Sequence, residues 1–158
     1  QLPTRDPHVG TCQFTRPLTL HDSILAQPLR GRARTEIFIG LLGLSGYIGD
    51  GSARWSAVAR TDAARLIRLG LERAPAAARL HAVAEPAVTT RAIAEALGSA
   101  LGLPVASIAP GDAEEHFGFI GHFFAQSMTA SSERTRALLA WTPSGPTLLE
   151  DIAAGAYS

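Results

Sequence analysis

The sequence predicts an α/β fold in which short strands alternate with helices. Two observations carry this prediction. Strand-like and helix-like segments alternate between residues 79 and 122, which is typical of α/β domains. From Tyr47 onward, residues that commonly cap or end helices bound each helical period. The chain has 158 residues, 46% of them hydrophobic, which is enough for one domain with a core.

The first helix is predicted over residues 61–73, where apolar side chains recur at helical spacing. Thr61 and Asp62 can cap its first turn with polar oxygen atoms. Residues 79–84 then predict a short strand, which Pro86 should end.

The next helix and strand follow directly. Thr89 or Thr90 is expected to begin a helix over residues 89–101, and Gly102 is expected to stop it. Residues 103–108 predict another strand.

Three shorter helices are predicted in the C-terminal third. The first opens at residues 110–112, where Asp112 and Glu115 can form a capping box. The second is capped by Ser131 and Ser132 and runs through Leu139, and the last covers residues 147–154.

The N-terminal part is unlike the rest. Residues 1–35 contain four prolines and the basic run at residues 30–34, and no helical or alternating period persists there. The sequence therefore divides into an irregular or divergent arm, residues 1–44, and a folded portion, residues 45–158. Disorder of the arm is the alternative.

Composition excludes several classes of partner and mechanism. The formal net charge is zero, so we expect neither nucleic acid nor an acidic membrane as a partner. No apolar run is long enough to span a bilayer. The single cysteine, Cys12, cannot form an internal disulfide, which fits a reducing cytoplasm. All fourteen basic residues are arginine, so no mechanism that needs a lysine ammonium can operate within this chain.

Gly40, Gly43 and Gly46 have the G-x-x-G-x-x-G spacing found in many dinucleotide-binding loops. Such a loop needs a helix that begins within the glycines, so that free N–H groups can hold the pyrophosphate. Gly49 and Gly51 follow too closely for that helix to form. We therefore favour a helix end or an apolar turn over residues 36–45, and a small dinucleotide-binding protein using Gly40–Gly46 is the weakest alternative.

The Gly49–Gly51 turn leads into Arg54 and Trp55. An arginine guanidinium suits a phosphate or carboxylate, and an indole offers a flat apolar wall. The alternative is a hairpin with a surface arginine and a core tryptophan.

Histidines and phenylalanines gather near residue 120. His116 and His122 would lie about 120° apart on one helix, so we predict no metal site. Four phenylalanines between residues 117 and 124 favour a core cluster, although a chain lacking a partner layer would expose some of them.

Five motifs together resemble the C-terminal half of extended or atypical short-chain dehydrogenases, the NAD-dependent epimerase/dehydratase family. The motifs are Gly49–Gly51 with Arg54-Trp55, the helix start Asp62–Leu66, the strand Leu80–Ala84, "GLPVASIAPGDAEEHFGFIG", and "SSERTRALLAWTP", in which Ala140 replaces the usual glycine. The resemblance covers roughly residues 45–158 and implies a partial Rossmann-type fold.

The resemblance implies a small-molecule substrate and NAD(P) as cofactor for the parent family. It also places Arg54, Trp55 and His116 at the substrate cleft. The family's Tyr-x-x-x-Lys pair cannot be built here, because the sequence has no lysine. We therefore expect a fragment that retains the substrate-binding half, has no catalytic residue of its own, and binds no cofactor and turns over no substrate alone. The alternative function is a non-catalytic interaction module that self-associates through exposed apolar surface.

Overall fold

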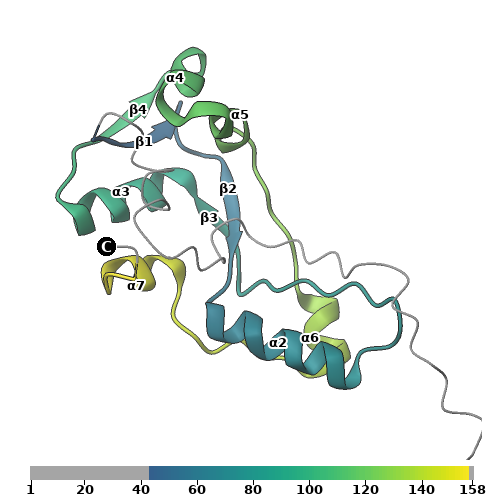
Figure 1. Cartoon of the computed structure of the whole chain (residues 1–158). Helices are drawn as coiled ribbons and strands as arrows, with labels where there is room; N and C mark the ends of the chain where they lie inside the picture. Colours follow the sequence, from purple (N-terminus) through teal and green to yellow (C-terminus); the bar gives the residue numbers. More distant parts are fainter. Residues whose placement is uncertain (1–42, 157–158) are drawn as a thin grey trace, which may run out of the picture.

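The computed structural model describes residues 43–156, and Figure 1 shows their course. The predictions for Gly40, for residues 30–34, for Cys12 and for almost all of the arm over residues 1–44 lie outside this range. The boundary at residues 44 and 45 therefore stays a prediction. No helix among residues 43–156 is long and apolar enough to cross a membrane.

The described residues form a mixed α/β structure, as the sequence predicts. The elements in chain order are β1 (Ser45–Ile48), β2 (Arg54–Ala57), α2 (Arg60–Arg73), β3 (Glu85–Thr89), α3 (Thr90–Leu101), β4 (Val105–Ile108), the 3-10 turn η3 (Pro110–Asp112), α4 (Ala113–Phe117), the 3-10 turn η4 (Gly118–Ile120), α5 (Gly121–Phe124), α6 (Glu133–Leu139) and α7 (Leu148–Ala153).

The strands form two separate pairs. β1 runs parallel to β4, with Ser45 opposite Val105, and β2 runs antiparallel to β3. A bridge between Trp55 and Met128 adds the segment after α5 to the free edge of β2. β1 and β2 therefore do not form the hairpin that was one interpretation of the glycine turn. Each of the two strands pairs instead with a strand that lies far along the chain.

Local capping signals placed α3 and α7 correctly. The Thr89 hydroxyl accepts a hydrogen bond from the Ala92 amide, and Gly102 ends α3 in the left-handed conformation, at φ 66°. Thr147 and Glu150 form a reciprocal capping box at the start of α7.

The predicted strand over residues 79–84 is wrong as an assignment. The ladder partner of β2 is Glu85–Thr89, and it includes Pro86, which was expected to break the strand. Proline is tolerated because β3 is an edge strand, and the Pro86 carbonyl still accepts a hydrogen bond from the Ser56 hydroxyl.

Two predicted caps are also absent. α2 begins at Arg60, and no side chain caps its first turn. Asp112 makes no capping hydrogen bond to α4, so the predicted capping box with Glu115 does not form. The hydroxyl of Ser132, at the start of α6, instead donates to the Val83 carbonyl. The side chains of Ser132 and Asp62, which can cap a helix, bind tertiary partners here.

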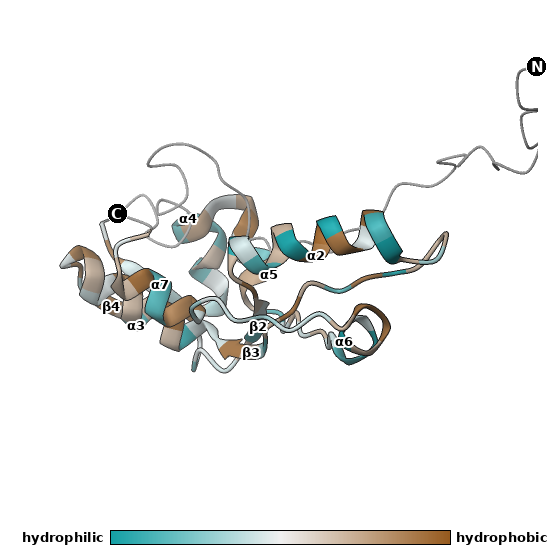
Figure 2. Cartoon of the chain, turned by 90° about the horizontal axis from the view of Figure 1, so that it is seen from below, coloured by the Kyte–Doolittle hydropathy of each residue, from teal (hydrophilic) through white to brown (hydrophobic). Residues whose placement is uncertain are grey.

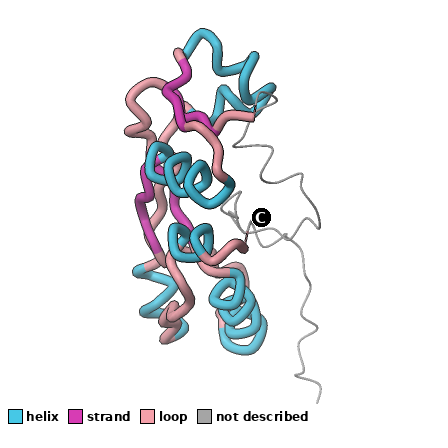
Figure 3. The backbone as a smooth tube through the Cα atoms, turned by 90° about the vertical axis from the view of Figure 1, so that its left-hand side faces the viewer, coloured by secondary structure: helices cyan, strands magenta, loops and turns pink. Residues whose placement is uncertain are grey.

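Two hydrophobic clusters lie along the described chain. One contains Trp55, Ile93 and Phe124 and joins β2 to α3, α5 and α7. The other contains Leu66 and Trp141 and joins α2 to α6. Figure 3 shows helices at both ends and in the middle of this elongated arrangement, with the strands between them.

Asp62 holds the chain after α6 against α2. Its buried carboxylate accepts hydrogen bonds from the backbone amides of Ser144 and Gly145, at 2.9 and 2.7 Å, and from the Arg65 guanidinium at 2.9 Å. The indole of Trp141 donates to the Asp62 carbonyl at 3.1 Å. Asp62 therefore acts as a tertiary clamp and not as the predicted helix cap.

We expect Asp62→Ala to lower the free energy of unfolding, because two backbone amides lose their acceptor. The loss should be roughly 1–3 kcal/mol, the usual penalty for buried donors left unpaired. Urea denaturation followed by circular dichroism measures it. Asp62→Asn, which keeps one acceptor oxygen, is the matched control and should lose less. Equal stability of the Ala variant and the wild type would contradict the clamp.

Candidate functional site

The Gly49–Gly51 loop closes the N-terminus of α3. The Gly51 carbonyl accepts hydrogen bonds from the Arg91 amide and from the Thr90 hydroxyl, both at 3.2 Å. The Ala53 carbonyl accepts from the Thr90 amide at 2.8 Å. Since Thr89 caps the next amide, the first turn of α3 is satisfied by the chain itself. It has no free row of N–H groups for a phosphate.

Two glycines of the sequence are required for different reasons. Gly51 has φ 69°, and a Cβ there would lie 2.5 Å from the Cβ of Arg91 and 2.7 Å from the Tyr47 ring. Gly46 lies inside β1, and a Cβ there would lie 2.8 Å from Nε2 of His116. Gly46 therefore makes room for a buried ring. Within the described chain no helix begins after it until Arg60, so the dinucleotide loop has no support in the geometry.

Arg54 and Trp55 lie on opposite faces of β2. Successive strand residues point to opposite sides, and here Arg54 is exposed whereas Trp55 is buried. The surface arginine and core tryptophan of the alternative interpretation are thus what the structure contains. Among the described residues, the Arg54 side chain makes no ion pair, and its backbone is fixed by Ser127 and Met128.

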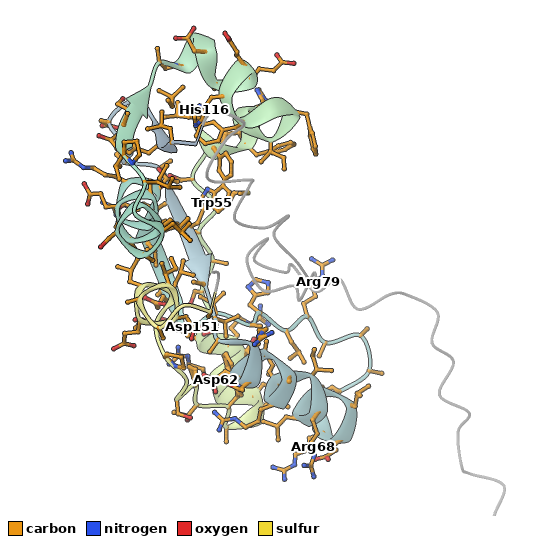
Figure 4. The ribbon with its side chains drawn as sticks, turned by 60° about the vertical axis from the view of Figure 1, so that its left-hand side comes forward. Trp55, Asp62, Arg68, Arg79, His116 and Asp151 are labelled. Carbon is orange, nitrogen blue, oxygen red and sulfur yellow. The ribbon has the colours of Figure 1, made fainter. Side chains whose placement is uncertain are left out.

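Trp55 and His116 are linked by an aromatic column. The Trp55 ring stacks on Phe124 with centroids 4.9 Å apart, Phe124 meets Phe117 edge-on at 4.9 Å, and Phe117 meets His116 at 4.5 Å. The Trp55 indole donates to the Gln126 carbonyl at 3.0 Å. Figure 4 shows His116 and Trp55 in the same half of the molecule, well separated from Asp62 and Arg68. Two of the three predicted site residues are thereby brought together.

His116 is the one described residue with a buried side-chain nitrogen that lacks a hydrogen-bond partner, and this atom is Nε2. The residue is only 4% exposed. Burial lowers the pKa of His116 from its ordinary value of 6.5, and a backbone hydrogen bond with Leu44 opposes this shift. The imidazole is therefore neutral near pH 7.

The phenylalanine cluster is only partly core. Phe117 and Phe124 are buried, whereas Phe119 is 78% and Phe123 47% exposed. Sequence spacing could not separate these pairs, because the segment is not one continuous helix but the three short elements α4, η4 and α5. The exposed pair lies beside the aromatic column and presents an apolar surface.

The described residues place an exposed guanidinium at Arg54, with the Trp55 indole buried on the other face of β2. The glycine loop binds α3, and the chain contains no lysine. No group of three or more metal-ligating side chains is found between residues 43 and 156. Gln126 and Ser127 were not predicted from the sequence, although they hold Trp55 and Arg54 from more than 70 residues away. Gln126 accepts through its backbone carbonyl, which every residue has, and Ser127 through a hydroxyl, so the sequence carried no specific signal for either.

Comparison with known sequences finds relatives longer than this chain. No protein-family model matches. An uncharacterized protein of Schizosaccharomyces pombe is 44% identical over 115 residues, which are 73% of this chain and 39% of that protein. An uncharacterized protein of Saccharomyces cerevisiae is 46% identical over 112 residues, or 71% of this chain and 38% of that protein. The chain thus spans about two fifths of the length of these curated relatives.

Comparison with solved structures establishes the fold. A human epimerase family protein solved with NADPH has a TM-score of 0.59 and 24% identity, over 81% of this chain and 44% of that one. DesIV, a dTDP-glucose 4,6-dehydratase from Streptomyces venezuelae solved with NAD, has a TM-score of 0.53 and 21% identity over 71% and 32%. MoeE5, solved with UDP-glucuronic acid and NAD, has a TM-score of 0.53 and 20% identity over 80% and 40%. The described residues form part of this Rossmann-type short-chain dehydrogenase fold.

Gly51→Ala should strongly destabilise the chain, because the new Cβ would clash with the Cβ of Arg91 in a conformation that alanine rarely adopts. We expect a loss of about 2 kcal/mol or more in free energy of unfolding, from overpacking and strain together. Gly49→Ala is the matched control. It has a similar φ of 60° but no atom within 4 Å of the Cβ position, so it should lose about 1 kcal/mol. Equal losses in chemical denaturation would contradict the role of Gly51.

Acidification should destabilise the chain through His116. The folded state favours the neutral ring, so the unfolded chain binds more protons below pH 6.5. The contribution of His116 is complete above that pH and is lost as the pH falls toward the lowered pKa of the folded state. Denaturation midpoints between pH 7.5 and 5 measure this loss. His116→Leu should reduce the dependence in that interval, and an unchanged pH profile in this variant would contradict the assignment.

Proposed function

We propose that this chain is the substrate-side portion of an NAD(P)-dependent oxidoreductase or epimerase of the short-chain dehydrogenase superfamily. The chain contributes the surface that contacts a small-molecule substrate. The cofactor-binding portion and the catalytic tyrosine–lysine pair are supplied by sequence that this chain does not contain. Alone, the chain binds no NAD(P) and has no turnover.

The main support for this proposal is that the chain matches only part of a fold that depends on a nucleotide cofactor. The human epimerase family protein was solved with NADPH, and this chain corresponds to 44% of it. The same chain contains no lysine, and within its described part the glycine loop is occupied by the start of α3. These features support a division in which cofactor chemistry lies outside this chain.

Arg54 is the proposed contact for an anionic group of the substrate. Its guanidinium is exposed, is free of ion pairs within the described part, and projects from a strand whose backbone is held on both edges. Trp55 and His116 support this surface from the buried side, because the aromatic column fixes β2 against α4 and α5. The UDP-glucuronic acid bound to MoeE5 is an example of an anionic ligand on this fold.

A non-catalytic interaction module is the second candidate. It is favoured by the exposure of large apolar side chains, among them Phe119 and Phe123 beside the aromatic column and Leu71 on α2. Such a module would associate through these side chains without any reaction.

NADPH binding by a chimera, compared with that by the 158-residue chain, distinguishes these two candidate functions. We expect fluorescence titration to show no saturable NADPH binding by the 158-residue chain. A chimera, in which this chain replaces the matched segment of the Schizosaccharomyces pombe relative, should bind NADPH saturably. The unaltered relative is the control for a competent cofactor portion.

Arg54→Ala in the chimera should leave NADPH affinity unchanged and weaken binding of UDP-glucuronic acid, used as an anionic probe. Steady NADPH oxidation by the 158-residue chain would refute the proposal. Failure of both the chimera and the relative to bind NADPH would refute it as well and favour the interaction module.

A further inference from the structure

The outer face of α2 carries a stripe of apolar side chains. Four exposed residues, spaced at intervals of four, three and four, lie on one side of the helix: Arg60, Ala64, Ile67 and Leu71. Ile67 is 45% and Leu71 66% exposed, whereas Leu66, on the opposite side, is buried. In Figure 2 polar and apolar turns alternate along α2. The helix therefore has a second apolar face, and this face is open to solvent.

The charge around this stripe is positive. α2 contains four arginines and only two acidic residues. Arg68 follows Ala64 by one helical turn, its side chain is 77% exposed, and its guanidinium pairs with Glu72 at 2.8 Å. Arg60 and Arg73, at the two ends of the helix, are exposed and form no ion pair with any described residue. We call the stripe together with Arg68 the basic surface.

A second apolar surface lies where α4 and α5 meet. Phe119 and Phe123, most exposed of the phenylalanines described above, stand two residues before and after Gly121. A Cβ on Gly121 would clash with the Ala113 carbonyl and would lie 3.2 Å from the Glu114 amide. The start of α5 is therefore pressed against the first turn of α4, and the two exposed rings flank this contact.

The first turn of α4 adds negative charge to these rings. Three exposed carboxylates lie at or just before it: Asp112, Glu114 and Glu115. None of them forms an ion pair with a described residue. The sequence contains no arginine between residues 92 and 133, so no guanidinium of the same segment offsets this charge. We call the two phenylalanines and these carboxylates the acidic surface.

The two surfaces lie at opposite ends of the described chain. Figure 1 shows α2 at one end and α4 with α5 at the other, and Figure 4 shows Arg68 of α2 far from His116 of α4. In this fold one molecule therefore cannot bring its basic surface onto its own acidic surface. The formal net charge of the whole chain is zero, so two copies have no overall repulsion to overcome.

We propose that the chain associates head to tail, with the basic surface of one copy seated on the acidic surface of the next. The apolar side chains of both surfaces are removed from water in this contact, and the opposite charges favour it over a contact between like surfaces. A second copy is the occupant because each copy carries both complementary surfaces. Since the two surfaces differ, each added copy leaves one free surface, and the assembly grows into a ring or an open chain. The inference does not depend on the proposed function, because neither surface includes Arg54 and the contact needs no nucleotide.

Sedimentation velocity of the 158-residue chain tests the proposal, with a reductant present so that Cys12 cannot link two copies. The weight-average sedimentation coefficient should rise between about 10 and 300 μM and pass the value of a dimer. Salt at about 1 M should lower it, because charges are then screened within about 3 Å. A chain that remains a monomer over this range, or that stops at a dimer, would overturn the proposal.

Two variants, studied alone and mixed, separate the head-to-tail contact from a symmetric one. Leu71→Asp disrupts the basic surface and Phe119→Ser the acidic surface, so each should weaken association by about tenfold or more. An equimolar mixture should form a heterodimer and nothing larger, because each variant keeps the surface that the other lacks. Ser99→Asp, at an exposed position of α3, makes the same change of charge as Leu71→Asp and should associate like the wild type.

Symmetric contacts give a different result in the same experiment. Dimerisation of either variant alone, with no gain on mixing, would show that like surfaces meet and would overturn the head-to-tail arrangement. Circular dichroism spectra and thermal melts establish that the variants are folded. If either variant unfolds, the concentration series of the wild-type chain decides alone.

The chimera with the Schizosaccharomyces pombe relative tests the occupant. Continued association of the chimera would support a second copy. Loss of association in the chimera, when the 158-residue chain associates, would assign one surface to the rest of the longer protein and overturn the second copy as its occupant. A chimera that associates but fails to bind NADPH, when the unaltered relative also fails, would refute the proposed function and leave this inference in place.

Discussion

A single buried carboxylate determines how the two ends of the described chain fit together. Asp62, at the start of α2, binds two backbone amides more than 80 residues away in the sequence. The loop it holds leads into α7, whose Leu148 and Ile152 enter the cluster around Trp55. Trp141, just before that loop, belongs to the other cluster and bonds to the Asp62 carbonyl. The bonds to Asp62 therefore fix where Trp141 and α7, on either side of that loop, pack in the two clusters.

The fold was predictable where the deciding interactions are local. Thr89 and Gly102 bound α3, and Thr147 and Glu150 cap α7, through hydrogen bonds that span only a few residues. Asp62 has the same capping chemistry, but a distant loop competes successfully for its oxygens. The strand assignments failed for a related reason. A strand is defined by its neighbour, and β2 pairs with β3 through residues that lie 28 to 35 positions apart in the sequence.

The candidate site, too, could be predicted from the sequence only in part, because tertiary contacts decide how its residues are arranged. Arg54 and Trp55 were selected because they are adjacent, but adjacency on a strand places them on opposite faces. The link between Trp55 and His116 runs through Phe117 and Phe124, and it depends on how α4 and α5 turn. The sequence thus identified residues of suitable chemistry, whereas their grouping depends on tertiary packing. Arg54 is exposed on the surface, whereas Trp55 and His116 are buried.

Gly43, Gly46 and Gly49, at the start of the described chain, share a three-residue spacing without sharing a cause; Gly40 of the predicted motif lies outside the described residues. Gly43 and Gly49 take positive φ angles with open space around them, whereas Gly46 has an ordinary backbone and lacks only the room for a methyl group. Natural variation should therefore treat the three positions independently. Asparagine, which tolerates the left-handed region, would be acceptable at the first and third positions. At Gly46 any larger residue would demand a compensating change at His116. A pattern search that reads the three glycines as one unit would misclassify chains of this kind.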